Sequence, residues 1–233
     1  MEGTRIIDIY RRLFNAYGPQ GWWPADGPFE MIVGAILTQA TSWENAEAAI
    51  DALRRAGLLS SRRMMGAPVD RIASLIRPAV YYNQKALKLR AFLDFLADRY
   101  GGDLDRLLEE PLPELREHLL SIRGIGPETA DSIVLYAAKK PSFVVDAYTK
   151  RLLTRLRLVD PSAGYDGISA LFTSALPADA DLFGEYHALI VRHCKEHCRA
   201  EPVCGGCPLG EVCPSSGLSR SVSGSAPEES RAG

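Results

Sequence analysis

Residues 119–146, LLSIRGIGPETADSIVLYAAKKPSFVVD, carry two glycines between two stretches of helical periodicity. A short pattern of leucines precedes the glycines, and apolar residues recur at helical spacing over residues 128–138 after them. Gly124 and Gly126 interrupt the pattern, and Pro127 suits the first turn of the second helix, where a missing N–H needs no partner. The stretch therefore predicts two helices joined by a tight glycine turn.

Two roles are open for this glycine turn, a phosphate-binding site or a simple connection. Bare glycine backbone lets amide N–H groups approach an anion closely, and the N-terminus of the following helix adds partial positive charge at the same place. From Ser121 to Leu158 the chain carries seven basic and three acidic residues, although its net charge is −2. This local excess of positive charge favours the phosphate-binding role.

An apolar run, Phe143-Val144-Val145, leads from the second helix to a single carboxylate, Asp146. A glycine hairpin, a helix and Val-Asp at this spacing resemble the helix-hairpin-helix DNA glycosylases of the endonuclease III superfamily. In that family the hairpin binds the DNA backbone, and the Asp is the catalytic carboxylate. The resemblance extends over residues 5–213. It implies that the partner is double-stranded DNA containing damaged bases and that Asp146 is catalytic.

The rest of the chain also predicts helices, and no alternating run is long enough to predict a strand. Residues 29–39 are apolar nearly all round, which indicates a central buried helix. The pattern Thr41-x-x-Glu44 is typical of a capping box that opens the next helix. The expected fold class is all-α, and the resemblance implies two helical lobes with a C-terminal iron–sulfur loop. Further helices are expected at residues 5–17, 43–56, 70–76, 167–175 and 181–196, with a long one ending at Tyr100.

One glycosylase region is expected over residues 1–213, followed by a tail. Residues 214–233 are rich in Ser and Gly and lack a core pattern, which predicts disorder. The expected parts of the glycosylase region are an inner six-helix lobe at about residues 28–140 with the hairpin at 120–127, a second lobe from residues 1–27 and 141–197, and a cluster loop at 198–213.

The composition predicts a protein of the cytoplasm. Of the 233 residues, 46% are apolar and 24% are charged, which is ordinary for a globular chain. No apolar run reaches membrane-spanning length, and the charged N-terminal residues lack the apolar core of a signal peptide. We expect a nucleoid-associated monomer that contacts no membrane.

All five cysteines lie between Cys194 and Cys213, which indicates a metal site, because disulfide frameworks are rare in the cytoplasm. Structural zinc sites usually combine two separated Cys pairs, and only one Cys-x2-Cys pair is present here. A single loop of four thiolates suits a [4Fe–4S] cluster better, and zinc stays the alternative. The expected ligands are Cys198, Cys204, Cys207 and Cys213.

Many members of the endonuclease III superfamily carry a C-terminal cluster loop, which supports the iron–sulfur interpretation and implies a structural cluster that shapes a basic loop for DNA. The usual first gap in that loop is six residues, and this chain has five. Cys194 fits less well as the first ligand and is expected to be a free buried thiol. His187, His193 and His197 are expected on helix faces or in solvent, because four cysteines already complete a site.

Other residues of the family carry over by position. Gln39 matches a glutamine that helps to fill the gap left by an extruded nucleotide, and residues 81–83 match the loop that wedges into the duplex. Local roles are the alternatives, since Gln39 could cap its own helix and Tyr82 could pack on the core. The expected DNA-contact residues are Gln39, Tyr81, Tyr82, Asn83, Arg123, Gly124, Ile125, Gly126 and Thr129.

The chain departs from the bifunctional members of the family at one decisive position. Those members read Gly-x-Gly-x-Lys-Thr-Ala, and their Lys attacks the sugar to form a Schiff base and nick the strand. This chain has Glu128 at that place, and a carboxylate cannot form an imine. Asp146 remains able to stabilise positive charge on the sugar and to orient a water. The sequence therefore predicts a monofunctional glycosylase.

The aromatic residues suggest the substrate. Trp22-Trp23-Pro24 and Trp43 resemble the branch of the superfamily that removes alkylated purines such as 3-methyladenine. An N3-alkylated adenine carries positive charge, so electron-rich rings bind it by stacking and cation–π attraction. Packing in the core is the alternative role of these four residues.

Two other functions stay open at this point. The chain could be a bifunctional enzyme for oxidised pyrimidines that uses another lysine, such as Lys139 or Lys150, for strand cleavage. It could also be a non-catalytic protein that binds damaged DNA through the hairpin.

Overall fold

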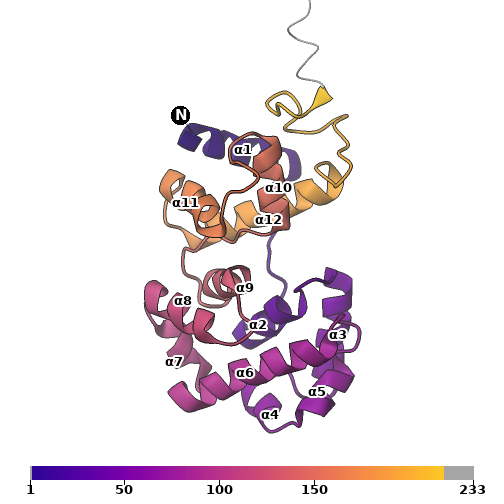
Figure 1. The fold of residues 1–233 in the computed structure, drawn as a ribbon, viewed down its shortest axis with the longest axis vertical. Helices are drawn as coiled ribbons and strands as arrows, with labels where there is room; N and C mark the ends of the chain where they lie inside the picture. Colours follow the sequence, from indigo (N-terminus) through magenta and orange to yellow (C-terminus); the bar gives the residue numbers. More distant parts are fainter. Residues whose placement is uncertain (1, 218–233) are drawn as a thin grey trace, which may run out of the picture. The chain divides into compact units, whose positions relative to one another are not determined.

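The computed structural model describes residues 2–217, and helices account for all of the regular secondary structure in this range (Figure 1). The predicted all-α class is confirmed. The expected disorder of residues 218–233 lies outside the described residues. Pro214 was the expected start of the tail, but the next two residues still bond to the fold. The Ser215 hydroxyl donates to the Arg155 carbonyl at 2.7 Å, and that of Ser216 donates to the Cys213 carbonyl at 2.9 Å.

The chain forms two compact units. Of the described residues, the first unit contains 2–20, 145–177 and 185–217, and the second contains 21–144 and 178–184. The first boundary thus follows Gln20 instead of residue 27. The helices of the second unit are α2 (Pro28–Leu37), α3 (Trp43–Arg55), α4 (Ser61–Met65), α5 (Val69–Leu75), α6 (Tyr82–Tyr100), α7 (Leu104–Glu109), α8 (Leu112–Ser121), α9 (Pro127–Ser132) and the π-helix η1 (Ile133–Ala137). The first unit contains α1 (Glu2–Tyr17), α10 (Ala147–Arg155) and α11 (Tyr165–Ala175), and α12 (Ala180–Glu196) passes from the second unit into the first.

The core of the second unit surrounds α2, as its apolar composition predicts. Every residue from Met31 to Leu37 is buried, and α2 packs against α3, α6, α9 and η1 (Figure 1). Gly34 lies in the middle of this helix, where an added Cβ would meet the indole Nε1 of Trp23 at 3.3 Å. The missing side chain at position 34 therefore lets the Trp23 ring lie against the helix.

In the first unit, α1 presents an apolar face to the core and packs against α11. Ile6, Ile9 and Leu13 are buried, as helical periodicity predicts. The buried Tyr186 of α12 donates its hydroxyl to the Ile6 carbonyl at 2.9 Å. Among the described residues, no helix combines the length and the apolar character that a membrane crossing requires.

Several local expectations were wrong. The α3 helix is capped by Ser42, whose side chain accepts from the Asn45 amide, and the expected cap at Thr41 lies one residue too early. The predicted helix over residues 128–138 is α-helical only to Ser132 and then widens into η1, where the Ala138 amide donates to the carbonyl five residues earlier. Leu87 is an apolar residue of α6 that does not join the core, because 59% of its surface is exposed.

Candidate functional site

The glycine hairpin joins α8 to α9 in the second unit. Gly124 has φ +91, and a Cβ there would lie 2.5 Å from Cγ of Lys88, so only glycine fits without a shift. The Ile125 amide donates to the Ile122 carbonyl at 3.1 Å, which closes the turn. Ile125 itself is buried, so its side chain anchors the hairpin in the core. The hairpin backbone is therefore the part that can meet a ligand.

Gln39 connects the end of α2 to this hairpin. Its Nε2 donates to the Thr129 Oγ1 at 2.8 Å and to the Gly124 carbonyl at 3.3 Å. Its Oε1 accepts from the ammonium of Lys88. The side chain of Gln39 therefore bonds to groups outside its own helix, and these bonds hold its amide in a defined orientation beside the turn. Nothing in the local sequence pattern indicated the contribution of Lys88.

A second lysine of α6, Lys85, bonds to the end of α2 near Gln39. Lys85 is 2% exposed, and its Nζ donates to the Leu37 carbonyl at the end of α2 at 2.8 Å. Burial, together with the nearby charge of Lys88, lowers the pKa of Lys85 to about 8. The cost of burying this ammonium is offset in part because it satisfies a helix C-terminal carbonyl.

The loop before α6 presents aromatic surface to solvent. Tyr81 adopts a left-handed conformation with φ 62 and is 63% exposed, and the neighbouring Val80 is 46% exposed. Tyr82 is half-buried, and the guanidinium carbon of Arg77 lies 5.8 Å from the centroid of the Tyr82 ring. Asn83 is exposed. Large apolar side chains in solvent are typical of a contact surface.

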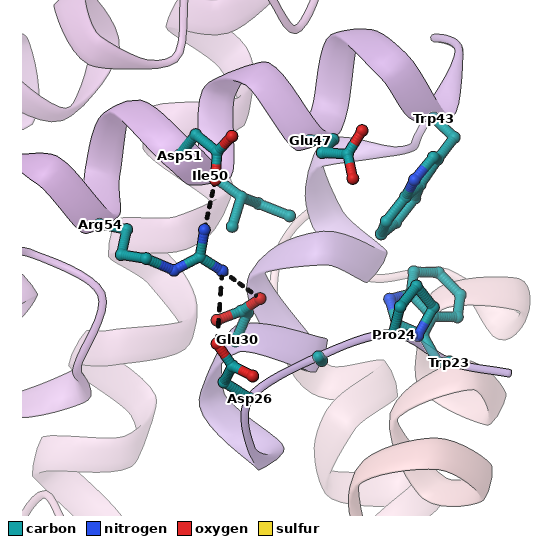
Figure 2. Close-up of a pocket in the computed structure, with 10 residues that line it drawn as sticks. Trp23, Pro24, Asp26, Glu30, Trp43, Glu47, Ile50, Asp51 and Arg54 are labelled. Atoms are coloured by element: carbon teal, nitrogen blue, oxygen red, sulfur yellow. Dashed lines mark hydrogen bonds and ion pairs between the residues drawn. The ribbon is translucent and has the colours of Figure 1, made fainter. Parts of the chain in front are cut away.

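Three of the four predicted pocket residues line one cavity of about 400 Å³ in the second unit (Figure 2). The Trp23 and Trp43 rings meet edge to face with centroids 5.5 Å apart, and Pro24 lies beside them. Trp22 is half-buried and contacts Trp23 but does not line the cavity. Sequence reasoning missed the charged residues of the same cavity, Asp26, Glu30, Glu47, Asp51 and Arg54.

Glu128 is the second residue of α9 and is exposed to solvent. A carboxylate in the first turn of a helix is favoured by the partial positive charge of the helix N-terminus. Arg123, on the other side of the hairpin, is exposed as well, and Thr129 is buried. No amine therefore follows the hairpin at the place where the bifunctional pattern has its lysine.

Asp146 belongs to the first unit and caps α10. Its Oδ1 accepts from the Thr149 amide at 2.7 Å, and its Oδ2 lies 3.5 Å from Nε2 of His187, a buried residue of α12. Burial alone would raise the pKa of Asp146, but the nearby His187 ring and the Thr149 amide bring it below its usual value. The fold thus keeps a largely buried carboxylate ionised.

Residues 33–178 match the model of a protein family described as HhH-GPD superfamily base excision DNA repair protein. The chain belongs to this family. A protein of Methanocaldococcus jannaschii that is named as a DNA repair glycosylase is 46% identical over 215 residues, which cover 89% of this chain and 95% of that protein. The HhH-GPD chain is accordingly a DNA glycosylase of base excision repair.

Solved structures agree on the HhH-GPD fold. An endonuclease III trapped as a covalent DNA intermediate superimposes with a TM-score of 0.80 at 20% identity and covers 94% of this chain and 98% of its own. The 3-methyladenine DNA glycosylase of H. pylori, bound to 1,N6-ethenoadenine, gives a TM-score of 0.73 at 25% identity and covers 84% of this chain and 98% of its own. The membership in the endonuclease III superfamily that the hairpin predicted is confirmed.

The HhH-GPD chain carries its cysteines at the end of α12 and in the loop that follows. Cys198 is 8% exposed, and its Sγ accepts from the Arg155 guanidinium at 3.2 Å. A hydrogen bond from Cys194 lowers the pKa of Cys198 to about 6, and Arg155 contributes in the same direction. Cys194 itself is buried, as expected, and its pKa is raised by this bond to Cys198. Among residues 2–217, no three His, Cys, Asp or Glu side chains are close enough together to hold a metal ion.

Two of the three histidines lie on a helix face, as expected, and that face is buried. His187 and His193 are 4% and 1% exposed, because both lie on the inner face of α12. The hydroxyl of Tyr17 lies 3.0 Å from Nδ1 of His193, and Sγ of Cys207 lies 3.8 Å from Nε2 of the same ring. Burial lowers the pKa of His193 to about 4, so the ring is neutral at pH 7. His193 thus packs against the cysteine loop, and His187 packs beside Asp146.

Proposed function

We propose that this DNA glycosylase is monofunctional and hydrolyses the N-glycosidic bond of an alkylated purine in double-stranded DNA, acting as a monomer. The proposal rests on the presence in one chain of an ionised, largely buried Asp146 and of Glu128 at the hairpin position where bifunctional members have the Schiff-base lysine. Such a chain keeps the carboxylate that hydrolysis needs and lacks the lysine amine that strand cleavage through a Schiff base needs.

Asp146 acts on the sugar. As the bond from C1′ to the base breaks, its electron pair leaves with the base, and positive charge develops on the sugar ring. A carboxylate that is already ionised and fixed by the Thr149 amide stabilises this charge without reorganisation. It also orients a water, whose oxygen bonds to C1′ and whose proton is released. His187 holds the carboxylate in its ionised form.

Glu128 cannot support strand cleavage through a Schiff base, which is the alternative to hydrolysis. A Schiff base needs an amine that attacks C1′, and the exposed carboxylate of Glu128 offers none. Lys150, one candidate for a substitute amine, donates its ammonium to the Ala163 carbonyl at 3.1 Å. An amine engaged in this way is a poor nucleophile, which supports hydrolysis over strand cleavage.

The DNA-contact residues that we propose combine three features of the second unit. The backbone of the hairpin, with Arg123 beside it, would bind phosphate oxygens. The exposed Tyr81 and its neighbours would enter the duplex, and the Gln39 amide would fill the space left by the extruded nucleotide. The aromatic cavity of Trp23 and Trp43 would receive the base. The H. pylori relative, a 3-methyladenine glycosylase bound to a modified adenine, supports a purine in this role.

We further propose that Cys198, Cys204, Cys207 and Cys213 hold a [4Fe–4S] cluster. Four sulfurs in a 16-residue loop suit such a cluster, and cluster ligands must be thiolates, which the lowered pKa of Cys198 favours. When bound, the cluster would order the loop and supply no catalytic chemistry. Purified protein should contain iron and acid-labile sulfide in equal amounts, whereas zinc alone would contradict the assignment.

Duplexes containing 3-methyladenine, N7-methylguanine, thymine glycol or an abasic site test the enzymatic proposal. We expect release of the alkylated purines, intact abasic strands and no adduct on treatment with borohydride. Glu128→Lys should restore a trappable adduct, because it returns an amine to the hairpin. Glu114→Lys, which makes the same charge change on α8, should not. Robust trapping by the unchanged protein, or excision limited to thymine glycol, would contradict the proposal.

A further inference from the structure

The cavity of the second unit has two chemically different walls (Figure 2). One wall consists of rings, with Trp23 and Pro24 facing Trp43. The other wall consists of charged side chains from the start of α2 and from α3. A volume of about 400 Å³ lies within the range of small-molecule sites and is large enough for a nucleobase. A ligand between the rings would therefore lie beside the charged wall.

The charged wall is negative. The guanidinium of Arg54 lies 2.7 Å from Glu30 and 3.8 Å from Asp26, and it also bonds to Asp51 (Figure 2). Three carboxylates thus share one cation. The hydrogen bond from Arg54 to Glu30 raises the pKa of the guanidinium, so the cation stays charged. The wall keeps an excess of negative charge even when Arg54 is counted in full.

Glu47 adds a fourth carboxylate, between the two walls. Trp43, Glu47 and Asp51 are spaced four residues apart on α3, which places them on one face of the helix. In Figure 2 Glu47 lies between the Trp43 ring and the Arg54 group. The structure gives Glu47 no hydrogen-bond or ion-pair partner among the described residues, and its side chain is exposed. It is the carboxylate of this cavity that is not engaged by Arg54.

We propose that this cavity selects formally cationic bases over neutral ones by charge, and that Glu47 is a specificity-determining residue for that choice. The inference rests on the proposed function, because it assigns the cavity to the extruded base. The rings stack on any flat base and add some preference for a cation through cation–π attraction. The carboxylates add a direct charge interaction that only a purine made positive by alkylation receives. Shape alone would not separate these two classes.

The reaction itself decides where the effect of Glu47 appears. Before cleavage, an alkylated purine carries the positive charge on its ring system. When the glycosidic bond breaks, the electron pair moves to the base, which leaves neutral, and the positive charge passes to the sugar. A carboxylate near the base therefore stabilises the bound substrate more than the transition state, so Glu47 increases affinity and does not increase kcat.

Glu47→Gln tests the inference with N7-methylguanine as the cationic lesion and hypoxanthine as the neutral one. For the cationic lesion we expect KM to rise up to about 5-fold, the upper end for one exposed charge pair, with kcat unchanged or higher. The affinity of Asp146→Asn protein for the same duplex, in which the lesion stays intact, should fall by the same factor when Glu47→Gln is added. The neutral lesion should be unaffected in both measurements.

Glu109→Gln is the matched control, since it removes another exposed carboxylate, from α7 and outside the cavity. It should leave the KM ratio of the two lesions unchanged. If the original protein excises N7-methylguanine and Glu47→Gln changes neither KM nor affinity, selection by charge is wrong and the proposed function stands. If the original protein releases no alkylated purine, both fail. An equal loss for both lesions would indicate a structural role for Glu47 and would also overturn the inference.

Discussion

Replacing Asp146 by Asn separates the chemical role of this residue from its structural one. Asp146 caps α10 through the Thr149 amide, and Asn is an equally good cap, so the helix keeps its hydrogen bond. The substitution removes the negative charge. A unit charge about 4 Å from a sugar cation, at an effective dielectric of about 20, contributes roughly 4 kcal/mol. This corresponds to a loss of about 10³-fold in the rate of base release.

Single-turnover excision from a 3-methyladenine duplex measures that rate, and thermal unfolding reports whether the variant is folded. Asp103→Asn, the same change at the cap of α7, is the control and should excise normally. Because the pKa of Asp146 is lowered in the fold, its ionised form stabilises the protein above the unfolded pKa of about 3.9. The stability difference between the original protein and Asp146→Asn should therefore shrink as the pH falls below about 4. A folded variant that excises within about 3-fold of the original rate would refute the proposed role.

Two further predictions concern the hairpin and its support. Gly124→Ala should lower the free energy of unfolding by about 1–3 kcal/mol and weaken DNA binding in anisotropy titrations, because φ is +91 and the added Cβ meets Lys88. Gly126→Ala, where nothing lies within 4 Å of the added Cβ, should cost less, and equal losses would contradict the steric argument. The pKa of Lys85 is lowered from 10.5 to about 8, so the unfolded chain binds the extra proton between these values and stability should rise with pH there. Chemical denaturation across this range should show a smaller rise for Lys85→Met, and identical slopes would contradict the assignment.

The elements that the sequence predicts well are those with a strong local signal. The two glycines and Pro127 located the hairpin, and the fully apolar stretch at 29–39 located the buried α2. Helices α4 and α7 escaped notice because five or six residues are too few for a visible period, although Ser60 and Asp103 cap them. Short capped helices of this kind are detectable only through the cap itself.

The candidate site was predicted less completely, because its supporting contacts join residues far apart in the chain. Lys88 reaches Gln39 across 49 positions, and Lys85 reaches Leu37 across 48. His187 meets Asp146 only because α12 packs beside the start of α10. No periodicity or short motif encodes such pairs. The residues that touch a ligand can be recognised by type, whereas those that orient them require the folded chain.

Gln39 illustrates how a repair enzyme can avoid being trapped by ordinary DNA. Without a duplex, its amide is already satisfied by Thr129, the Gly124 carbonyl and Lys88. In the role proposed for it, insertion beside an orphaned base would exchange these bonds for new ones, and each hydrogen bond has a net value of only about 1 kcal/mol. The free energy of this exchange would be close to zero, so Gln39 would not favour insertion at an intact base pair. Insertion would then occur where damage has weakened the base pair.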